Sequence, residues 1–174
     1  MSHVSDRAKC SKGTLYSYFA SKEELFCEVV IDGTTQESQT LFIELETSDE
    51  TAEKVLHQFG IGFLKTLYAP KFQALRRLVF SAAFDKSLGR AVYEKGVKPY
   101  EIQAANLLLT LMEKGQLRRT APDIAAHHLC GLLESETLLK FLLGALDAPR
   151  PKKLEEIANR AVAVFCAAYV LDPS

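Results

Sequence analysis

The chain has 174 residues, of which 48% are hydrophobic, and its formal net charge at pH 7 is −1. This length is enough for one substantial hydrophobic core, or for a small domain joined to a larger one. The near-neutral balance excludes a chain that is basic over its whole surface, and no apolar stretch reaches the roughly 20 residues that a membrane-spanning helix needs.

The charge is distributed unevenly along the chain. Residues 1–22 contain four basic side chains against one acidic side chain, whereas the remainder of the chain has an acidic excess. A basic end on an acidic body is typical of a protein that meets phosphate at one end only.

The N-terminus and the cysteines indicate a cytoplasmic protein. The first residues are polar and do not resemble a signal peptide. The cysteines form no CxxC pair, and we expect them to be reduced and to serve as packing residues. They are Cys10, Cys27, Cys130 and Cys166.

Residues 4–19 have the spacing of a helix-turn-helix. Val4 and Ala8 lie four apart on one helical face, and a three-residue break follows them. Ser11, the last residue of that break, can cap a second short helix. In this second helix Leu15 and Phe19 are four apart and are expected to point inward.

The polar residues of the second short helix fall on the side away from Leu15 and Phe19, which makes it the candidate recognition helix. Thr14 and Ser17 are short enough to meet base edges or a thymine methyl group. Tyr16 and Tyr18 are long enough to reach the DNA backbone, although packing of their rings within a small domain is the alternative. Lys12 can reach either target, and Gly13 allows a close approach to the groove.

The rest of the chain predicts helices joined by short turns, with no strand pattern. Residues 21–24, Ser-Lys-Glu-Glu, form a capping box that predicts a helix over 22–46. Pro70 and Pro122 stand where helices favour proline, in the first turn, and Gly115 stands where a helix-ending glycine belongs. The further helices are expected at about 48–68, 70–84, 88–114 with an interruption at Gly96 and Pro99, 122–146 and 153–171.

The last two of these helices are more apolar than a monomer needs, because apolar residues cover much of their circumference. Two such helices can form a four-helix interface with their symmetry mates, and the alternative is that they are central in the monomer. We expect the homodimer. Its expected interface residues are Leu132, Leu139, Leu143, Ala161, Phe165 and Ala168.

Residues 11–25, which read SKGTLYSYFASKEEL, closely resemble the signature of the TetR family of transcriptional regulators. The body resembles the AefR-like branch of TetR C-terminal domains more loosely, over residues 72–169. The suggestive stretches are FQALRRLV at 72–79, KGQL at 114–117, DIAA at 123–126, GLL at 131–133 and Val164-Phe165 with Tyr169.

The resemblance implies an all-α protein with two regions. Residues 1–45 would hold the helix-turn-helix and a connecting helix, and residues 46–174 a helical-bundle domain for ligand binding and dimerisation. The family has a further helix before the segment that begins at Met1, so the resemblance implies a DNA-binding domain without its first helix. The positions that match family contacts to the double-stranded DNA operator are Ser11, Lys12, Gly13, Thr14, Tyr16, Ser17, Tyr18 and Lys22.

The resemblance also implies a repressor that a small-molecule effector releases from DNA. Aromatic and apolar side chains on helices that should converge suit an apolar or aromatic effector, although for any one of them alone an ordinary core is the favoured interpretation. They are Phe59, Phe63, Phe80, Phe84, Tyr100, Leu108 and Met112.

Alternatives from other classes are weaker. No phosphate loop, GxSxG or HExxH motif indicates an enzyme, and we expect no catalytic residue and no cofactor. His127 and His128 with Glu134 suggest a metal site at first sight, but adjacent histidines on a helix point about 100° apart, and we expect no metal. The main alternative is a truncated helical protein that binds a ligand and dimerises but does not bind DNA.

Overall fold

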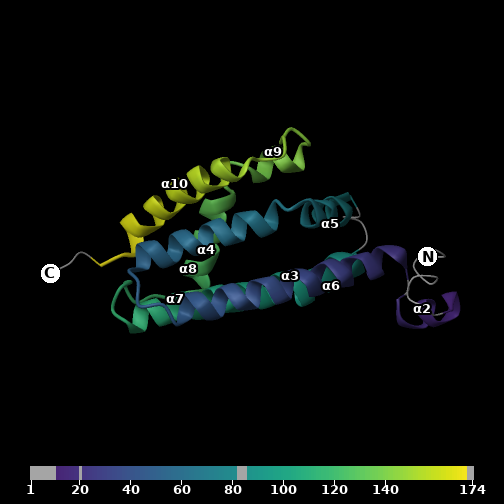
Figure 1. Ribbon diagram of the computed structural model, residues 1–174, viewed down its shortest axis with the longest axis horizontal. Helices are drawn as coiled ribbons and strands as arrows, with labels where there is room; N and C mark the ends of the chain where they lie inside the picture. The colour runs from purple at the N-terminus through teal and green to yellow at the C-terminus, as the bar shows by residue number, and fades with distance from the viewer. Residues whose placement is uncertain (1–10, 20, 82–85, 172–174) are drawn as a thin grey trace.

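The computed structural model describes residues 11–19, 21–81 and 86–171, without the side chains of Lys12, Thr34, Gln36 and Glu37. The predicted first helix with Val4 and Ala8, together with Cys10, lies outside the described residues. The all-α fold is confirmed, since the β pairing in these ranges is one isolated antiparallel bridge between Leu117 and Val170. The elements, drawn in Figure 1, are α2 (Lys12–Tyr18), α3 (Lys22–Glu46), α4 (Ala52–Leu67), α5 (Pro70–Ser81), α6 (Lys86–Val92), the π-helical segment η1 (Tyr93–Val97), α7 (Lys98–Glu113), α8 (Pro122–Glu134), α9 (Leu138–Leu142) and α10 (Pro151–Tyr169).

The capping box places the start of α3 where the sequence predicts it. Ser21 is extended, with φ −146° and ψ 168°, and its hydroxyl accepts a hydrogen bond from the Glu24 amide at 3.0 Å. The first turn carries Glu23 and Glu24, whose charges suit the positive end of the helix dipole. The helix then runs without a break to Glu46, as expected.

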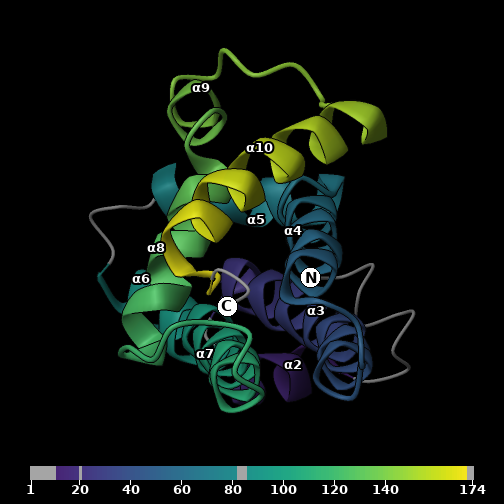
Figure 2. The same ribbon diagram turned by 90° about the vertical axis from the view of Figure 1, so that its left-hand side faces the viewer.

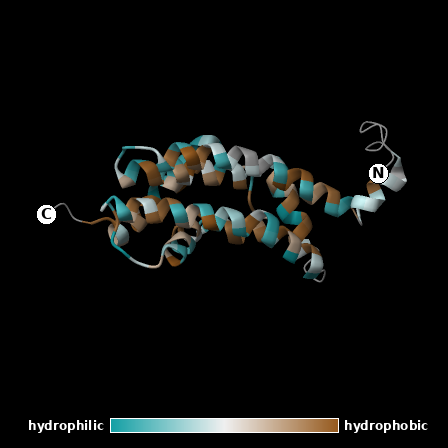
Figure 3. Cartoon of the chain, turned by 90° about the horizontal axis from the view of Figure 1, so that it is seen from below, coloured by the Kyte–Doolittle hydropathy of each residue, from teal (hydrophilic) through white to brown (hydrophobic). Residues whose placement is uncertain are grey.

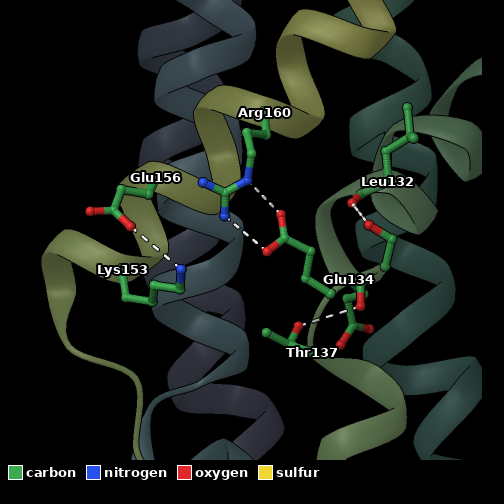
Figure 4. A network of polar contacts seen from close by, with 8 residues as sticks. Leu132, Glu134, Thr137, Lys153, Glu156 and Arg160 are labelled. Atoms are coloured by element: carbon green, nitrogen blue, oxygen red, sulfur yellow. Dashed lines mark hydrogen bonds and ion pairs between the residues drawn. The ribbon is translucent and has the colours of Figure 1, made fainter.

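The prediction of one helix over 122–146 is wrong, because a turn separates α8 from α9. Within this turn the Ser135 hydroxyl donates to the Leu132 carbonyl at 2.7 Å, and the Thr137 hydroxyl donates to the Glu134 carbonyl at 3.4 Å (Figure 4). Hydroxyls that bond nearby carbonyls compete with the backbone amides that would continue a helix. Gly144 follows α9 with φ at 68°, a left-handed conformation that favours glycine.

A surface ion pair attaches α10 to this turn. Arg160 on α10 donates from Nε and Nη2 to the two carboxylate oxygens of Glu136, each at 2.8 Å (Figure 4). The hydrogen bonds to the Glu136 carboxylate raise the pKa of Arg160, and the same bonds hold the pKa of Glu136 below its usual range. Because both side chains are largely exposed, the pair orients the turn more than it stabilises the fold.

The expected interruption at Gly96 and Pro99 takes the form of a π-helical turn. Lys98 donates its backbone N–H to the Tyr93 carbonyl, five residues earlier, so the helical run continues through η1 into α7. Pro99 is the second residue of α7 and has no N–H to donate to the carbonyls of η1, which fits the irregular hydrogen bonding at this point of the helical run.

The main core lies where α4 and α10 pack against each other and against α8, with α7 and the second half of α3 closing the other side (Figures 1 and 2). Figure 3 shows hydrophobic and hydrophilic residues on nearly every helix, as amphipathic helices require. Gly60 allows the close approach, because a Cβ at that position would lie 3.0 Å from Leu133 Cδ2 and 3.4 Å from Ala158 Cβ.

A second, smaller cluster holds the first half of α3. Cys27, Val30 and Ile31 of α3 are buried with Leu75 of α5. The short helix α2 lies beyond this end of α3, away from the main core (Figure 1). Among the helices of the described ranges, none combines the length and the apolar character needed to cross a membrane.

Candidate DNA-binding and effector-binding sites

Helix α2 is capped as the sequence predicts. Ser11 is extended, with φ −74° and ψ 155°, and its hydroxyl accepts a hydrogen bond from the Thr14 amide at 3.0 Å. Leu15 is buried and Phe19 is half-buried, so these two residues form the inward side of the helix. The opposite side is therefore open to solvent.

The exposed side of α2 carries hydroxyl groups and two tyrosines. The Ser17 hydroxyl donates to the Thr14 carbonyl at 2.7 Å, which leaves its oxygen free to accept. Tyr16 and Tyr18 are 54% and 77% exposed, respectively, in the described part of the chain. A Cβ at Gly13 would contact only the Ser11 hydroxyl within 4 Å, which leaves this position open. The side chain of Lys12 lies outside the described part of the chain.

Lys22 is exposed and is the first residue of α3. The unpaired amides of a helix start attract anions, and an ammonium group there adds to that attraction. Glu23 and Glu24 in the same turn offset part of this positive potential. The structure thus places α2 and the start of α3, with its exposed Lys22, at one end of the molecule (Figure 1).

Three of the residues predicted for effector binding come together with one that was not predicted. Phe59 and Phe63 of α4 and Tyr100 of α7 surround one another at centroid distances of 5.6 to 6.1 Å. Phe42 of α3 completes this aromatic cluster, 5.1 Å from Tyr100 and 5.8 Å from Phe59. Phe42 was missed because a phenylalanine on the apolar side of a long helix gives no local signal for its partners.

Among the described residues, the other side chains predicted for effector binding lie apart from the rings of the aromatic cluster or belong to the main core. Phe80 is 47% exposed, and its ring lies 6.3 Å from that of Phe141 on α9. Leu108 and Met112 are buried in the main core. Phe84 lies outside the described residues.

A buried polar network beside the aromatic cluster was not predicted from the sequence. Arg76 of α5 donates from Nη2 to Glu134 Oε1 of α8 at 2.9 Å, and only 10% of its side chain is exposed. The Tyr68 hydroxyl donates to Thr137 Oγ1 at 2.6 Å and lies 3.0 Å from the same Glu134 oxygen. The guanidinium also lies 4.5 Å from the ring centroid of Phe141. Arg76 and Glu134 are 58 residues apart, so no local pattern could pair them.

Burial raises the pKa values of three titratable side chains in this part of the molecule. Desolvation raises the pKa of the Cys130 thiol to about 12, and it raises the pKa of the Tyr100 phenol still further. Both groups are therefore protonated at neutral pH. Desolvation also raises the pKa of Tyr68, against the opposing effect of its hydrogen bond to Thr137.

The residues predicted for the dimer interface divide into two groups. Leu139 on α9 and Leu143 directly after it are 66% and 73% exposed, Ala168 is exposed, and Leu132 is half-buried. Ala161 and Phe165 instead lie in the core of the chain itself, where the Phe165 ring stacks on Tyr169 at 4.2 Å. Their side of α10 faces α4 and α8, so a partner subunit cannot reach them without opening the core.

The residues of the rejected metal site have separate partners. His128 Nδ1 is 2.5 Å from the Tyr169 hydroxyl, whereas His127 Nε2 is 3.7 Å from Glu101. Glu134 faces Arg76 instead.

Two family models match the chain. Residues 1–29 match the model of bacterial regulatory proteins of the tetR family, and residues 54–170 match that of the C-terminal domain of AefR-like transcriptional repressors. A comparison with curated proteins gave no match.

Solved structures of the same family have the same fold. A TetR-family regulator from Mesorhizobium loti is 28% identical with a TM-score of 0.83, over 97% of this chain and 85% of that one. A TetR regulator from Agrobacterium tumefaciens is 25% identical with a TM-score of 0.71, over 98% and 84% of the two chains. The flavonoid-responsive regulator FrrA shares the fold at 23% identity and a TM-score of 0.67, over 99% and 87%. The chain therefore belongs to the TetR family of transcriptional regulators and carries an AefR-like C-terminal domain.

Proposed function

We propose that this protein is a repressor that binds an operator in double-stranded DNA and leaves it when a small apolar or aromatic molecule binds in the body. The observation that carries the proposal is the open face of α2, on which Thr14, Tyr16, Ser17 and Tyr18 are exposed next to Lys22. In a recognition helix the short hydroxyls would meet base edges, and the tyrosines and lysine would meet the phosphates on either side.

Helix α3 supplies the connection between the two proposed sites. Phe42 of the aromatic cluster and Lys22 at the DNA-facing end belong to this one helix, 20 residues apart. At 1.5 Å per residue the helix spans about 30 Å between them. A ligand that changed the packing around Phe42 would tilt α3 and move α2. In a dimer this would alter the spacing of two recognition helices, which must match successive major grooves.

The direct test is binding to the DNA upstream of the protein's own gene, measured by fluorescence anisotropy at fixed salt. We expect an affinity at least about a thousandfold higher than for a scrambled duplex of the same length, as is typical of specific DNA binding. Equal affinity for both duplexes would contradict the proposal and would favour a ligand-binding protein without an operator.

Lys22→Ala is expected to weaken binding to operator and scrambled DNA by the same factor, because a phosphate contact carries no sequence information. The slope of log affinity against log salt should fall by about one per half-site. Lys65→Ala, which removes an exposed lysine from α4, is the matched control and should leave both quantities unchanged. An unchanged salt slope in Lys22→Ala would exclude the phosphate contact.

We also propose that the protein is a homodimer through the exposed apolar side of α9 and α10. Leu139 and Leu142 of α9, Leu143 directly after it and Val164 of α10 are each at least 50% exposed. A monomer rarely leaves so many large apolar side chains in water. The proposed interface also includes the half-buried Leu132 of α8 and the exposed Ala168 of α10.

Leu143→Glu is expected to convert the dimer to a folded monomer, because it places a charge in the proposed interface but outside the core of each subunit. Sedimentation velocity at micromolar concentration measures the change, and circular dichroism should show unchanged helix content. Lys152→Glu, an exposed change at the start of α10, is the control and should remain a dimer. A wild-type monomer at this concentration would contradict the proposal.

A further inference from the structure

A cavity of about 510 Å³ lies between α9 and the first turns of α10, beside the loop that joins them. It is open to solvent on one side, and its volume falls within the range of roughly 300–1,000 Å³ that is typical of small-molecule sites. Phe59, Phe63 and Tyr100 do not line it, so it is separate from the aromatic cluster. The proposed function therefore leaves this cavity without a role.

Backbone hydrogen bonds hold the walls of the cavity at both ends of the loop. After α9 the Ala145 amide donates to the Lys140 carbonyl at 2.8 Å, and the Gly144 amide donates to the Phe141 carbonyl at 3.0 Å. With Gly144 at a φ of 68°, these two bonds form a Schellman motif, which fixes the direction in which the chain leaves the helix. At the other end the Arg150 carbonyl accepts the first hydrogen bonds of α10. The loop therefore starts and ends in defined geometry.

The floor of the cavity is apolar. Ile157 of α10 is 1% exposed and Leu146 of the loop is half-buried, and both line the cavity together with Ala145. Thr137 also lines it, but its hydroxyl is already bonded to that of Tyr68 at 2.6 Å. Among the described residues no aromatic side chain lines the cavity, so the floor favours an aliphatic group over a ring that gains from stacking.

The rim of the cavity is charged, and two of its charges are already paired. The charged lining residues are Glu136, Lys140, Asp147, Arg150 and Lys153. Glu136 accepts from the Arg160 guanidinium at both carboxylate oxygens, each at 2.8 Å, and Lys153 lies 3.5 Å from Glu156 (Figure 4). These two residues therefore contribute little net charge to the rim.

The other two cations of the rim, Lys140 and Arg150, form no ion pair within the part of the chain that the structure describes. Asp147 offsets one of them, so one positive charge remains in excess. The first amides of α10, which no side chain caps, add to this positive potential. A single negative charge would balance the rim, whereas a dianion would also be repelled by its carboxylates.

We propose that this cavity binds an aliphatic monocarboxylate of medium chain length. The ammonium of Lys140 and the guanidinium of Arg150 donate to its carboxylate, and its hydrocarbon chain lies on Ala145, Leu146 and Ile157. The bound molecule thus connects α9 to the start of α10. Its binding requires neither an operator nor an effector at the aromatic cluster.

The test uses the whole chain without DNA and three probes of equal length: octanoate, 1-octanol and octylammonium. Isothermal titration calorimetry is expected to give the tightest binding for octanoate and the weakest for octylammonium. Lys140→Gln and Arg150→Gln should each weaken octanoate about three- to tenfold, an effect between that of an exposed ion pair and that of a hydrogen bond to a charged group. Both variants should leave octanol binding unchanged. Lys152→Gln, at an exposed lysine of the same helical turn that does not line the cavity, is the matched control and should change neither affinity.

A second measurement locates the ligand. In amide NMR spectra octanoate is expected to shift the signals of residues 140–157 and not those of Phe59, Phe63 and Tyr100. Ala145→Phe, at an exposed position that lines the cavity, should abolish binding of octanoate and octanol and leave the melting temperature unchanged.

Four outcomes would each overturn the proposal: no binding of octanoate, equal affinity for all three probes, shifts centred on the aromatic cluster, or unchanged octanoate affinity in the double variant Lys140→Gln/Arg150→Gln. Binding that appeared only in the Leu143→Glu monomer would also overturn it, because the partner subunit would then fill the cavity. Since none of these measurements involves DNA, a failure to bind an operator would overturn the proposed function and leave this site standing.

Discussion

Replacing Glu134 with leucine is expected to lower the free energy of unfolding by about 3–5 kcal/mol, the usual effect of breaking a buried ion pair by removing one partner. The change leaves the Arg76 guanidinium charged, with only 10% of its side chain exposed and facing the rings of Tyr68, Phe80 and Phe141. It also removes an acceptor that lies 3.0 Å from the Tyr68 hydroxyl. Urea denaturation followed by circular dichroism measures the loss.

A double variant distinguishes the lost pair from lost packing. Arg76→Met together with Glu134→Leu removes both charges and keeps similar volumes, so it should recover most of the stability that Glu134→Leu loses. Tyr68→Phe should cost about 1 kcal/mol, because it breaks the 2.6 Å hydrogen bond to Thr137 and leaves the ion pair intact. If the double variant were as unstable as Glu134→Leu, the loss would not come from an unpaired Arg76.

The same network joins the parts of the molecule on which the proposed regulation depends. Arg76 belongs to α5, whose Leu75 is buried against the first half of α3. Glu134 ends α8, next to the turn that leads into the exposed leucines of α9. A change in packing near Arg76 would therefore affect both the helix that carries the proposed DNA-binding end and the proposed dimer surface.

The starts of α2 and α3 could be predicted from the sequence, because each depends on a capping residue and its near neighbours. Ser11 and Ser21 each accept the hydrogen bond that their positions imply, so α2 and α3 begin where expected. The break between α8 and α9 was missed, because Thr137 interrupts the helix partly through its bond to Tyr68, 69 residues away. A leucine-rich pattern continues across this break and imitates one long helix.

The candidate sites could be predicted to different degrees, because some depend on neighbouring residues and others on contacts between residues far apart in the sequence. The exposed hydroxyls and tyrosines of α2 follow from helical periodicity over seven residues. The aromatic cluster needs four residues from three helices, and periodicity identifies each as apolar without pairing them. The ion pair of Arg76 with Glu134 could not be found at all, since both residue types are usually solvated and nothing near either one indicates burial.

Phe165 was expected at the subunit interface but is buried in the chain's own core. Its replacement is therefore the second change for which we expect a large loss of stability. Phe165→Ala is expected to lower the free energy of unfolding by about 3–5 kcal/mol, because the fully buried ring leaves a cavity and loses its stacking on Tyr169. Urea denaturation of both proteins at the same concentration measures this loss of stability. Phe26→Ala, at a ring that is 36% exposed on α3, is the matched control and should cost less than about 2 kcal/mol. If Phe165→Ala instead produced a stable monomer with nearly wild-type unfolding, the residue would belong to the interface and the packing of α10 against α4 would need revision.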